Sequence, residues 1–220
     1  MELLAYGHAG MPVLVFPTSR GRFYEYENNG MIHAISQKIE NGQYQVFCVD
    51  SVDAESWYNR GIHPHDRVMR HVAYENYVLF EVAPLMKNLS GWQQICTTGC
   101  SFGAYHGLNL ALRHPDLVSS CIAMSGAYEM KPFMDGYYDT DFYFQNPVDY
   151  VPNQNDPWFL DRWRAMKIVL AVGDWDICLG ENFRMANILG AKQIPHWLDV
   201  WTGNEKHDWP LWQRMAVKFF

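Results

Sequence analysis

Short runs of apolar residues alternate along the chain with longer segments in which apolar residues recur at helical spacing. Runs of the first kind predict six buried strands, at 13–16, 44–49, 94–98, 118–124, 168–172 and 196–201. Segments of the second kind predict five helices, at 31–39, 66–89, 102–114, 181–189 and from 209 onward. Pro84 is expected to kink or break the second helix near its end, and Gly190 to cap the fourth.

Apolar strands that alternate with helices indicate an α/β architecture, in which a mostly parallel sheet is covered by helices on both faces. Residues 128–164 depart from this pattern, because they are rich in aromatic residues, proline and glycine and have no clear period. We expect this segment to be an irregular insertion with short helices. No repeat or linker marks a second domain, so residues 1–220 are predicted to form one domain. Ligands of such sheets bind at the carboxyl ends of the strands.

The composition narrows the classes of function. Hydrophobic residues make up 49% of the 220 residues and charged residues 19%, which is enough for a large core and too apolar for disorder. A net charge of −7 without a basic cluster argues against nucleic-acid binding. The longest apolar runs, such as 168–172, are far shorter than the roughly 20 residues of a membrane span.

The cysteines and the first residues bear on the compartment. Five cysteines, an odd number without a C-x-x-C pair, argue against a disulfide framework or a structural zinc site. The N-terminal residues lack the basic region and the apolar region of a signal peptide. Both observations favour the reducing cytoplasm.

The sequence Gly99-Cys100-Ser101-Phe102-Gly103 fits the pattern G-x-S-x-G and lies between a predicted strand and a predicted helix. The glycines allow a turn too sharp for Cβ atoms beside the serine, and such a turn exposes the serine hydroxyl at the edge of the sheet. The N-terminus of the following helix favours negative charge that develops there. An ordinary Gly-rich strand–helix turn is the alternative. Ser101 is therefore the candidate nucleophile.

A serine hydroxyl is a weak nucleophile at neutral pH and requires a base, which a carboxylate in turn orients. In sheets with this turn the chain order is serine, acid, histidine, which excludes the five histidines before Ser101. His106 and His114 lie on the next helix and are expected to be structural, and His196 opens a strand at the opposite end of the sheet. His207 lies in a polar loop after the last strand, where the mechanism places the base. A surface-loop histidine is its alternative role.

Two aspartates are candidates for the acid. Asp174 and Asp176 follow strand 168–172, on either side of Trp175. Strand geometry alone does not choose between them, although the position after the glycine turn favours Asp176. The aspartate that is not the acid is expected to accept hydrogen bonds from loop amides.

The motifs and their order resemble the esterase-D-like branch of the α/β-hydrolases, which includes feruloyl esterases, S-formylglutathione hydrolases and mycolyltransferases. The resemblance runs over nearly the whole chain from about Val13. Its segments are Gly99-Cys100-Ser101-Phe102-Gly103, Ala123-Met124-Ser125-Gly126, Val172-Gly173-Asp174-Trp175-Asp176 and His207-Asp208-Trp209 with Trp212. In that family the acid stands at the last position of the Gly-x-x-Asp segment. The resemblance thus implies Ser101, Asp176 and His207 as the catalytic triad.

The resemblance also implies where an oxyanion formed on the substrate would bind. The family places a His-Gly pair after the strand that corresponds to 13–16, and the residue after that glycine donates its backbone N–H. This chain departs from the pattern and reads Pro17-Thr18-Ser19 there. By position the donors are the N–H groups of Ser19 and of Phe102, which follows the nucleophile. Pro17 has no N–H to offer.

Two further groups of residues have both a functional and a structural interpretation. His63, His65, Asp66 and His71 suggest a metal site, but their spacing matches no known metal motif, and we expect a polar loop with a helix N-cap. Aromatic residues near the strand ends and in segment 128–164 either line an acyl or aryl pocket or pack a small lid against the body. These residues are Trp57, Tyr58, Tyr128, Phe133, Tyr137, Tyr138, Phe142 and Tyr143.

We therefore expect an α/β-hydrolase fold and a serine esterase that cleaves a carboxylic ester, or a thioester, through an acyl-enzyme. Ser101 attacks, His207 transfers the proton and Asp176 orients His207. The N–H groups of Ser19 and Phe102 bind the oxyanion. No cofactor or metal is required, and the expected partner is a small-molecule ester rather than nucleic acid or a membrane. Acyl transfer to an alcohol and a non-catalytic binding protein on the same scaffold are the alternatives.

Overall fold

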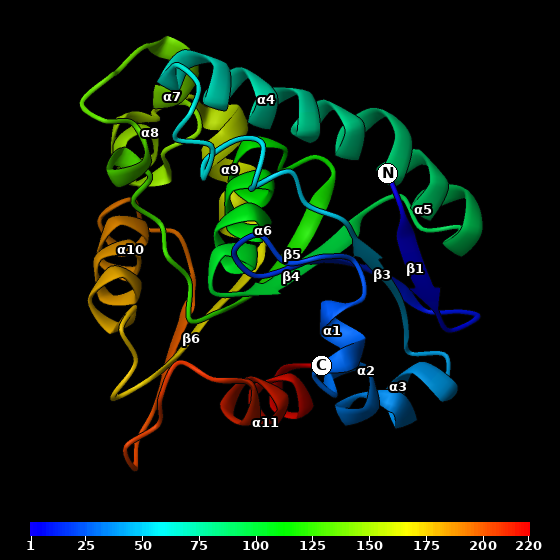
Figure 1. Cartoon of the computed structure of the whole chain (residues 1–220). Coiled ribbons are helices and arrows are strands. Elements are labelled where there is room, and N and C mark those ends of the chain that lie inside the picture. Colours follow the sequence, from blue (N-terminus) through cyan, green and yellow to red (C-terminus); the bar gives the residue numbers. More distant parts are fainter.

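A seven-stranded sheet runs through the middle of the computed structural model, which describes residues 1–220 (Figure 1). Its strands, in spatial order, are β1 (Leu3–Tyr6), β3 (Tyr44–Val49), β2 (Met11–Phe16), β4 (Ile95–Cys100), β5 (Val118–Met124), β6 (Lys167–Gly173) and β7 (Trp197–Trp201). Only β1 is antiparallel to its neighbour, and every other pair is parallel. The predicted α/β fold with a mostly parallel sheet is confirmed.

Helices cover both faces of the sheet. One face carries α1 (Glu25–Asn28), α2 (Met31–Ala34), α3 (Ser36–Glu40) and α11 (Trp209–Phe219), which lie in the lower part of Figure 1. The other face carries α4 (Pro64–Tyr77), α5 (Ala83–Ser90), α6 (Phe102–Arg113) and α10 (Leu179–Ala191). None of these helices combines the length and the apolar character that crossing a bilayer requires.

Alternate residues of the strands feed two separate hydrophobic cores, because successive side chains of a strand point to opposite faces. Val13 and Val15 of β2 belong to a cluster of 20 buried residues under α1–α3 and α11. Leu14 and Phe16 belong to a cluster of 39 under α4, α5, α6 and α10. The second face is thus the thicker side of the molecule, and α6 packs there against β4 and β5.

We expected Pro84 to kink or break the long helix after residue 66, and the structure shows that the helix does not end there. The helix continues through α4, the π-helix η1 (Val78–Val82) and α5. Pro84 stands in the first turn of α5, where a missing N–H is tolerated. The irregularity is a wider π turn immediately before it rather than an end.

Three other details also differ from the predictions. Gly190 does not cap α10, which runs on through Ala191 to a C-cap at Lys192. The edge strand β1 was not predicted, because its four residues give too short a pattern to register as a strand. The helix predicted at 31–39 is divided into α2 and α3 at Ile35.

The segment between β5 and β6 contains short helices, as predicted. They are η2 (Lys131–Phe133), α7 (Thr140–Tyr143), α8 (Pro147–Asn153) and α9 (Pro157–Ala165). Tyr128, Phe142 and Trp163 of this segment are fully buried in the larger core. Trp163 also donates its Nε1–H to the carbonyl of Leu112 at 2.8 Å, which ties α9 to the end of α6. The segment is therefore fixed to the body by aromatic packing.

We predict that Trp163→Ala lowers the free energy of unfolding by about 3–5 kcal/mol, because it leaves a large cavity and an unpaired Leu112 carbonyl. Trp158→Ala is the matched control on the same helix. Its side chain is 41% exposed, and the expected loss is below about 1 kcal/mol. Urea titration followed by circular dichroism measures both values. Equal losses for the two variants would contradict the assignment of Trp163 as the anchor.

Candidate active site

The strand β4 passes into helix α6 through a very sharp turn at Ser101. The backbone of Ser101 has φ 56° and ψ −119°, which a non-glycine residue adopts only when its surroundings enforce it. A Cβ on Gly99 would lie 2.4 Å from the carbonyl carbon of Gly103, and a Cβ on Gly103 would lie 2.3 Å from the carbonyl oxygen of Phe16. Only glycine fits at these two positions. The turn predicted from the G-x-S-x-G pattern is present.

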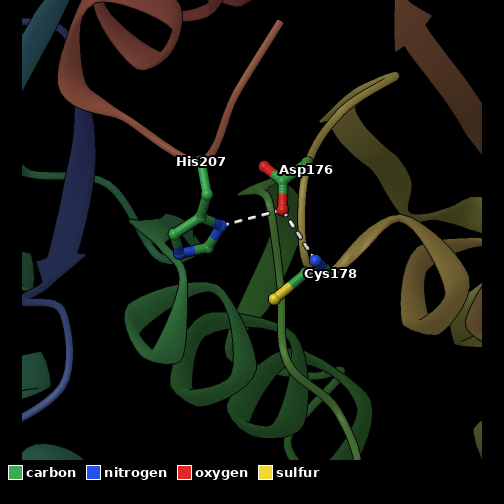
Figure 2. Close-up of side chains that lie close together, drawn as sticks. All are labelled: Asp176, Cys178 and His207. Carbon is green, nitrogen blue, oxygen red and sulfur yellow. Dashed lines mark hydrogen bonds and ion pairs between the residues drawn. The ribbon is translucent and has the colours of Figure 1, made fainter.

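The structure brings Ser101, His207 and Asp176 together in one chain of hydrogen bonds. Ser101 Oγ lies 2.9 Å from His207 Nε2, and His207 Nδ1 lies 2.8 Å from Asp176 Oδ1. Figure 2 shows the imidazole of His207 pointing at the Asp176 carboxylate, which comes from the loop after β6. With Nδ1 protonated, the ring donates to Asp176 and is free to accept the Ser101 proton at Nε2.

The Asp176 carboxylate is held in its ionised form. Its side chain is inaccessible to solvent, and Oδ1 also accepts the Cys178 N–H at 2.7 Å (Figure 2). Burial raises the pKa of this carboxyl, but hydrogen bonding by His207, Ser125 and the Cys178 amide outweighs burial and leaves the pKa below its ordinary value. The buried Oδ2 has no regular hydrogen-bond partner in the protein, so the hydrogen bonds at Oδ1 hold the carboxylate in place. A charged carboxylate at this position stabilises an imidazolium at His207.

Trp212 contacts both His207 and Ser125. Its indole N–H donates to Ser125 Oγ at 2.8 Å, and its ring packs edge-on against His207 with centroids 4.9 Å apart. Trp212 is buried on α11. The imidazole is therefore restrained from the side as well as through its nitrogen atoms.

Asp174, the second candidate for the acid, has the other predicted role. Its carboxylate accepts three backbone N–H groups of the loop after β7: those of Gly203 at 3.0 Å, Asn204 at 3.3 Å and Glu205 at 2.7 Å. These hydrogen bonds lower the pKa of Asp174 below its ordinary value. Asp174 therefore holds the loop that carries His207, whereas Asp176 contacts His207 itself.

Gly173 permits this loop to approach β6. A Cβ at Gly173 would lie 2.2 Å from the carbonyl oxygen of Glu205, which also accepts the Trp175 N–H at 3.0 Å. The two loops at the carboxyl ends of β6 and β7 are thus joined backbone to backbone. Their contact sets the position of His207 relative to Asp176.

Ser19 and Phe102, the candidate oxyanion donors, follow neighbouring strands. Phe16 of β2 pairs with Gly99 of β4, so the loops after these strands lie side by side. Phe102 is the first residue of α6, and its N–H has no acceptor within the helix. The Ser19 N–H makes no hydrogen bond within the protein, and the Ser19 hydroxyl accepts a hydrogen bond from Tyr58 at 2.8 Å. Neither N–H group therefore has an acceptor within the protein.

The structure separates the aromatic residues that were considered for a pocket. Trp57, Tyr128 and Phe142 are fully buried in the core, so they pack rather than line a site. Tyr58 and Phe133 are only half-buried, and their rings lie 5.0 Å apart. The Tyr58 ring also contacts Phe102 at 5.5 Å. These two residues are the aromatic groups that lie beside the candidate oxyanion donors.

The histidines around residue 65 do not converge on one point. His63 caps the N-terminus of α4, as predicted, and its Nδ1 accepts the His65 N–H at 3.2 Å. His65 pairs with Asp139 at 2.9 Å, and His71 is buried against Gln145. His65, Asp139 and Asp141 offer three oxygen or nitrogen atoms within 4.8 Å of one another, but the Asp139 oxygens already accept protein donors.

Comparison with known proteins places the chain in a family. A family model described as the alpha/beta hydrolase fold matches residues 12–176, and the chain belongs to this family. The match includes Ser101 and Asp176 and ends before the His207 loop. No curated protein sequence matches the chain significantly.

Solved structures with low sequence identity share the fold. A ferulic acid esterase has 14% identity and a TM-score of 0.73, over 96% of this chain and 83% of its own. The S-formylglutathione hydrolase FrmB from Staphylococcus aureus has 15% identity and a TM-score of 0.69, over 96% and 80%. The fluorophosphonate-binding serine hydrolase F of the same organism has 15% identity and a TM-score of 0.60, over 96% and 82%.

We predict that Asp174→Ala slows the labelling of Ser101 by a fluorophosphonate about 10- to 100-fold, because the freed loop lets His207 move away from the hydroxyl. Lys206→Ala is the control, since Lys206 lies exposed in the same loop without a hydrogen bond to the rest of the protein. Labelling rates come from a time course read by mass spectrometry. A normal rate in folded Asp174→Ala would show that the loop does not depend on this carboxylate.

Proposed function

We propose that the protein is a serine esterase that cleaves a carboxylic ester through an acyl-enzyme. The observation that carries the proposal is the unbroken chain of hydrogen bonds from Ser101 Oγ through His207 to the buried Asp176 carboxylate. A serine in such a chain loses its proton to the imidazole as it attacks a carbonyl. The strained turn at Ser101 and the two N–H groups without protein acceptors support the same interpretation.

The reaction follows from this geometry in two halves. Ser101 Oγ attacks the ester carbonyl while His207 Nε2 takes its proton, and the carbonyl oxygen becomes an oxyanion beside the Ser19 and Phe102 N–H groups. His207 then gives the proton to the leaving alcohol as the carbon–oxygen bond breaks. In the second half, water attacks the acyl carbon and loses its proton to His207. His207 returns this proton to Ser101 Oγ as the bond between Oγ and the acyl carbon breaks and the carboxylic acid leaves. Asp176 stabilises the imidazolium in both halves.

The named activities of the similar structures agree with the proposal. A ferulic acid esterase and an S-formylglutathione hydrolase act on an oxygen ester and a thioester, and both share this fold. We accordingly propose small-molecule esters as substrates, with thioesters as the second class. All five cysteines are free and buried, which supports our expectation of a reducing compartment.

We expect Ser101→Ala to reduce the turnover of p-nitrophenyl acetate by at least about 10⁴-fold, and Asp176→Asn to reduce it by about 10⁴-fold. The first substitution removes the nucleophile, and the second removes the charge that orients and stabilises His207. Ser90→Ala, at a half-buried serine on α5, serves as the control for a lost hydroxyl. Circular dichroism verifies that each variant is folded. Turnover in Ser101→Ala equal to wild type would refute the proposal.

Hydrolysis rather than acyl transfer is expected to dominate. Ser19 is exposed and Ser101 is only half-buried, so water has free access to an acyl group on Ser101. Added methanol should therefore divide the acetyl group between methyl acetate and acetate in roughly the ratio of the two nucleophiles, which gas chromatography measures. A strong preference for the alcohol at low methanol concentration would identify a transferase instead.

A further inference from the structure

The loop after β2 comprises residues 17–21. Of its three successive backbone N–H groups at residues 18, 19 and 20, the first and the last donate to carboxylates and the middle one has no acceptor. The Thr18 N–H donates to Glu25 Oε2 at 2.8 Å, and the Thr18 hydroxyl donates to the other oxygen of the same carboxylate at 2.9 Å. The Arg20 N–H donates to Asp53 Oδ2 at 3.3 Å. Between them, the Ser19 N–H has no acceptor in the protein. The two carboxylates thus engage the flanking donors and leave only the middle one for a ligand.

The loop is a turn closed by one hydrogen bond of its own, from the Gly21 N–H to the Thr18 carbonyl at 2.8 Å. Arg20 has φ 56°, in the left-handed region that a residue with a Cβ rarely adopts. The hydrogen bond from the Arg20 N–H to Asp53 helps to hold this strained backbone conformation. Loss of the acceptor would free the Ser19–Arg20 peptide at the centre of this turn to rotate, which changes the backbone next to the Ser19 N–H.

Asp53 is itself fixed from the other side by a histidine on α6. Its Oδ1 lies 2.9 Å from His106 Nε2, and both side chains are almost completely inaccessible to solvent. The His106 ring stacks on Phe16 at 5.6 Å and packs edge-on against Phe102 at 5.1 Å. Both oxygens of this buried carboxylate have a partner, one in the loop and the other on α6, and these contacts offset the cost of burying its charge.

The Asp53 carboxylate therefore joins the two elements that would supply the oxyanion donors. One of its oxygens binds the residue after Ser19, and the other binds the helix that begins at Phe102. A shift of either donor by about 1 Å is enough to cost a large part of the rate of an acyl transfer.

We infer that Asp53 and His106 are positioning residues for the oxyanion site: they hold the Ser19 N–H and the N-terminus of α6 at a fixed separation. The inference rests on the proposed function and adds a buried Asp–His pair that contacts neither the substrate nor the triad. Its effect is on the transition state, because the oxyanion exists only after Ser101 has attacked.

The test is to measure kcat and KM of the full chain with p-nitrophenyl acetate. Asp53→Ala is expected to lower kcat about 10- to 100-fold and to change KM less than about threefold, since only the transition state uses the donors. Asp53→Asn keeps an oxygen for the Arg20 N–H and is expected to restore kcat to within about fivefold of wild type. His106→Leu is the second variant. It leaves the carboxylate but frees it from α6, and a fall in kcat of about 10-fold is expected.

Glu75→Ala is the matched control for a lost buried carboxylate. Glu75 accepts hydrogen bonds from Arg113 and His114 in the same core but contacts no residue of the 17–21 loop. It is expected to lower the urea midpoint as much as Asp53→Ala while kcat stays within about twofold of wild type.

The outcomes are distinguishable. Wild-type kcat in both folded Asp53→Ala and folded His106→Leu overturns the inference, and so does an equal loss of kcat in Glu75→Ala, which would indicate a purely structural effect. Ser101→Ala measured in parallel tests the proposed function separately. If wild type and Ser101→Ala both lack turnover, the proposed function fails, and the inference fails with it.

Discussion

The contact between the Gly103 backbone and the carbonyl oxygen of Phe16 is the constraint on which the site depends. There is no room at this contact for a Cβ, so α6 begins directly against the end of β2. The same close packing, together with the contact between Gly99 and Gly103, enforces the strained backbone at Ser101. Ser101, the N-terminus of α6 and the loop after β2 consequently lie against one another, and we expect a shift of one to move the others.

A second backbone contact, between the loops after β6 and β7, does the same for Asp176 and His207. Gly173 lets the Glu205 carbonyl approach, and Asp174 closes the contact with its hydrogen bonds to the loop amides. Asp176 and His207 are then carried on two loops that act as one unit. The candidate site thus forms where two units meet, the turn at Ser101 and the joined loops after β6 and β7. Strand β5 lies between them, and the Ser101 N–H donates to the carbonyl of Met124 at its end, at 2.8 Å.

Local patterns were sufficient for part of this structure. The turn at Ser101 was predictable because its glycines are close in sequence, and His207 because chain order and strand ends leave few other positions. The choice between Asp174 and Asp176 came from a family resemblance. In the structure the two residues differ in their partners, because Asp174 binds loop amides and Asp176 binds His207. These contacts join separate loops, so no local pattern in the sequence indicates them. Asp53 could not be found, because its partners are 33 and 53 residues away and its loop has no periodic signal. Pro84 indicated an irregularity in the long helix, but the local pattern did not show that the helix continues past it through a π turn.

The central claim is that Ser101 carries the acyl group during turnover. The most direct measurement is to mix wild-type protein with p-nitrophenyl acetate, stop the reaction with acid within its first turnovers and map the modified peptide by mass spectrometry. The account predicts an acetyl group on Ser101 that disappears as the reaction continues to completion. An acetyl group found only on another side chain, or steady turnover with no covalent adduct at any time, would contradict it.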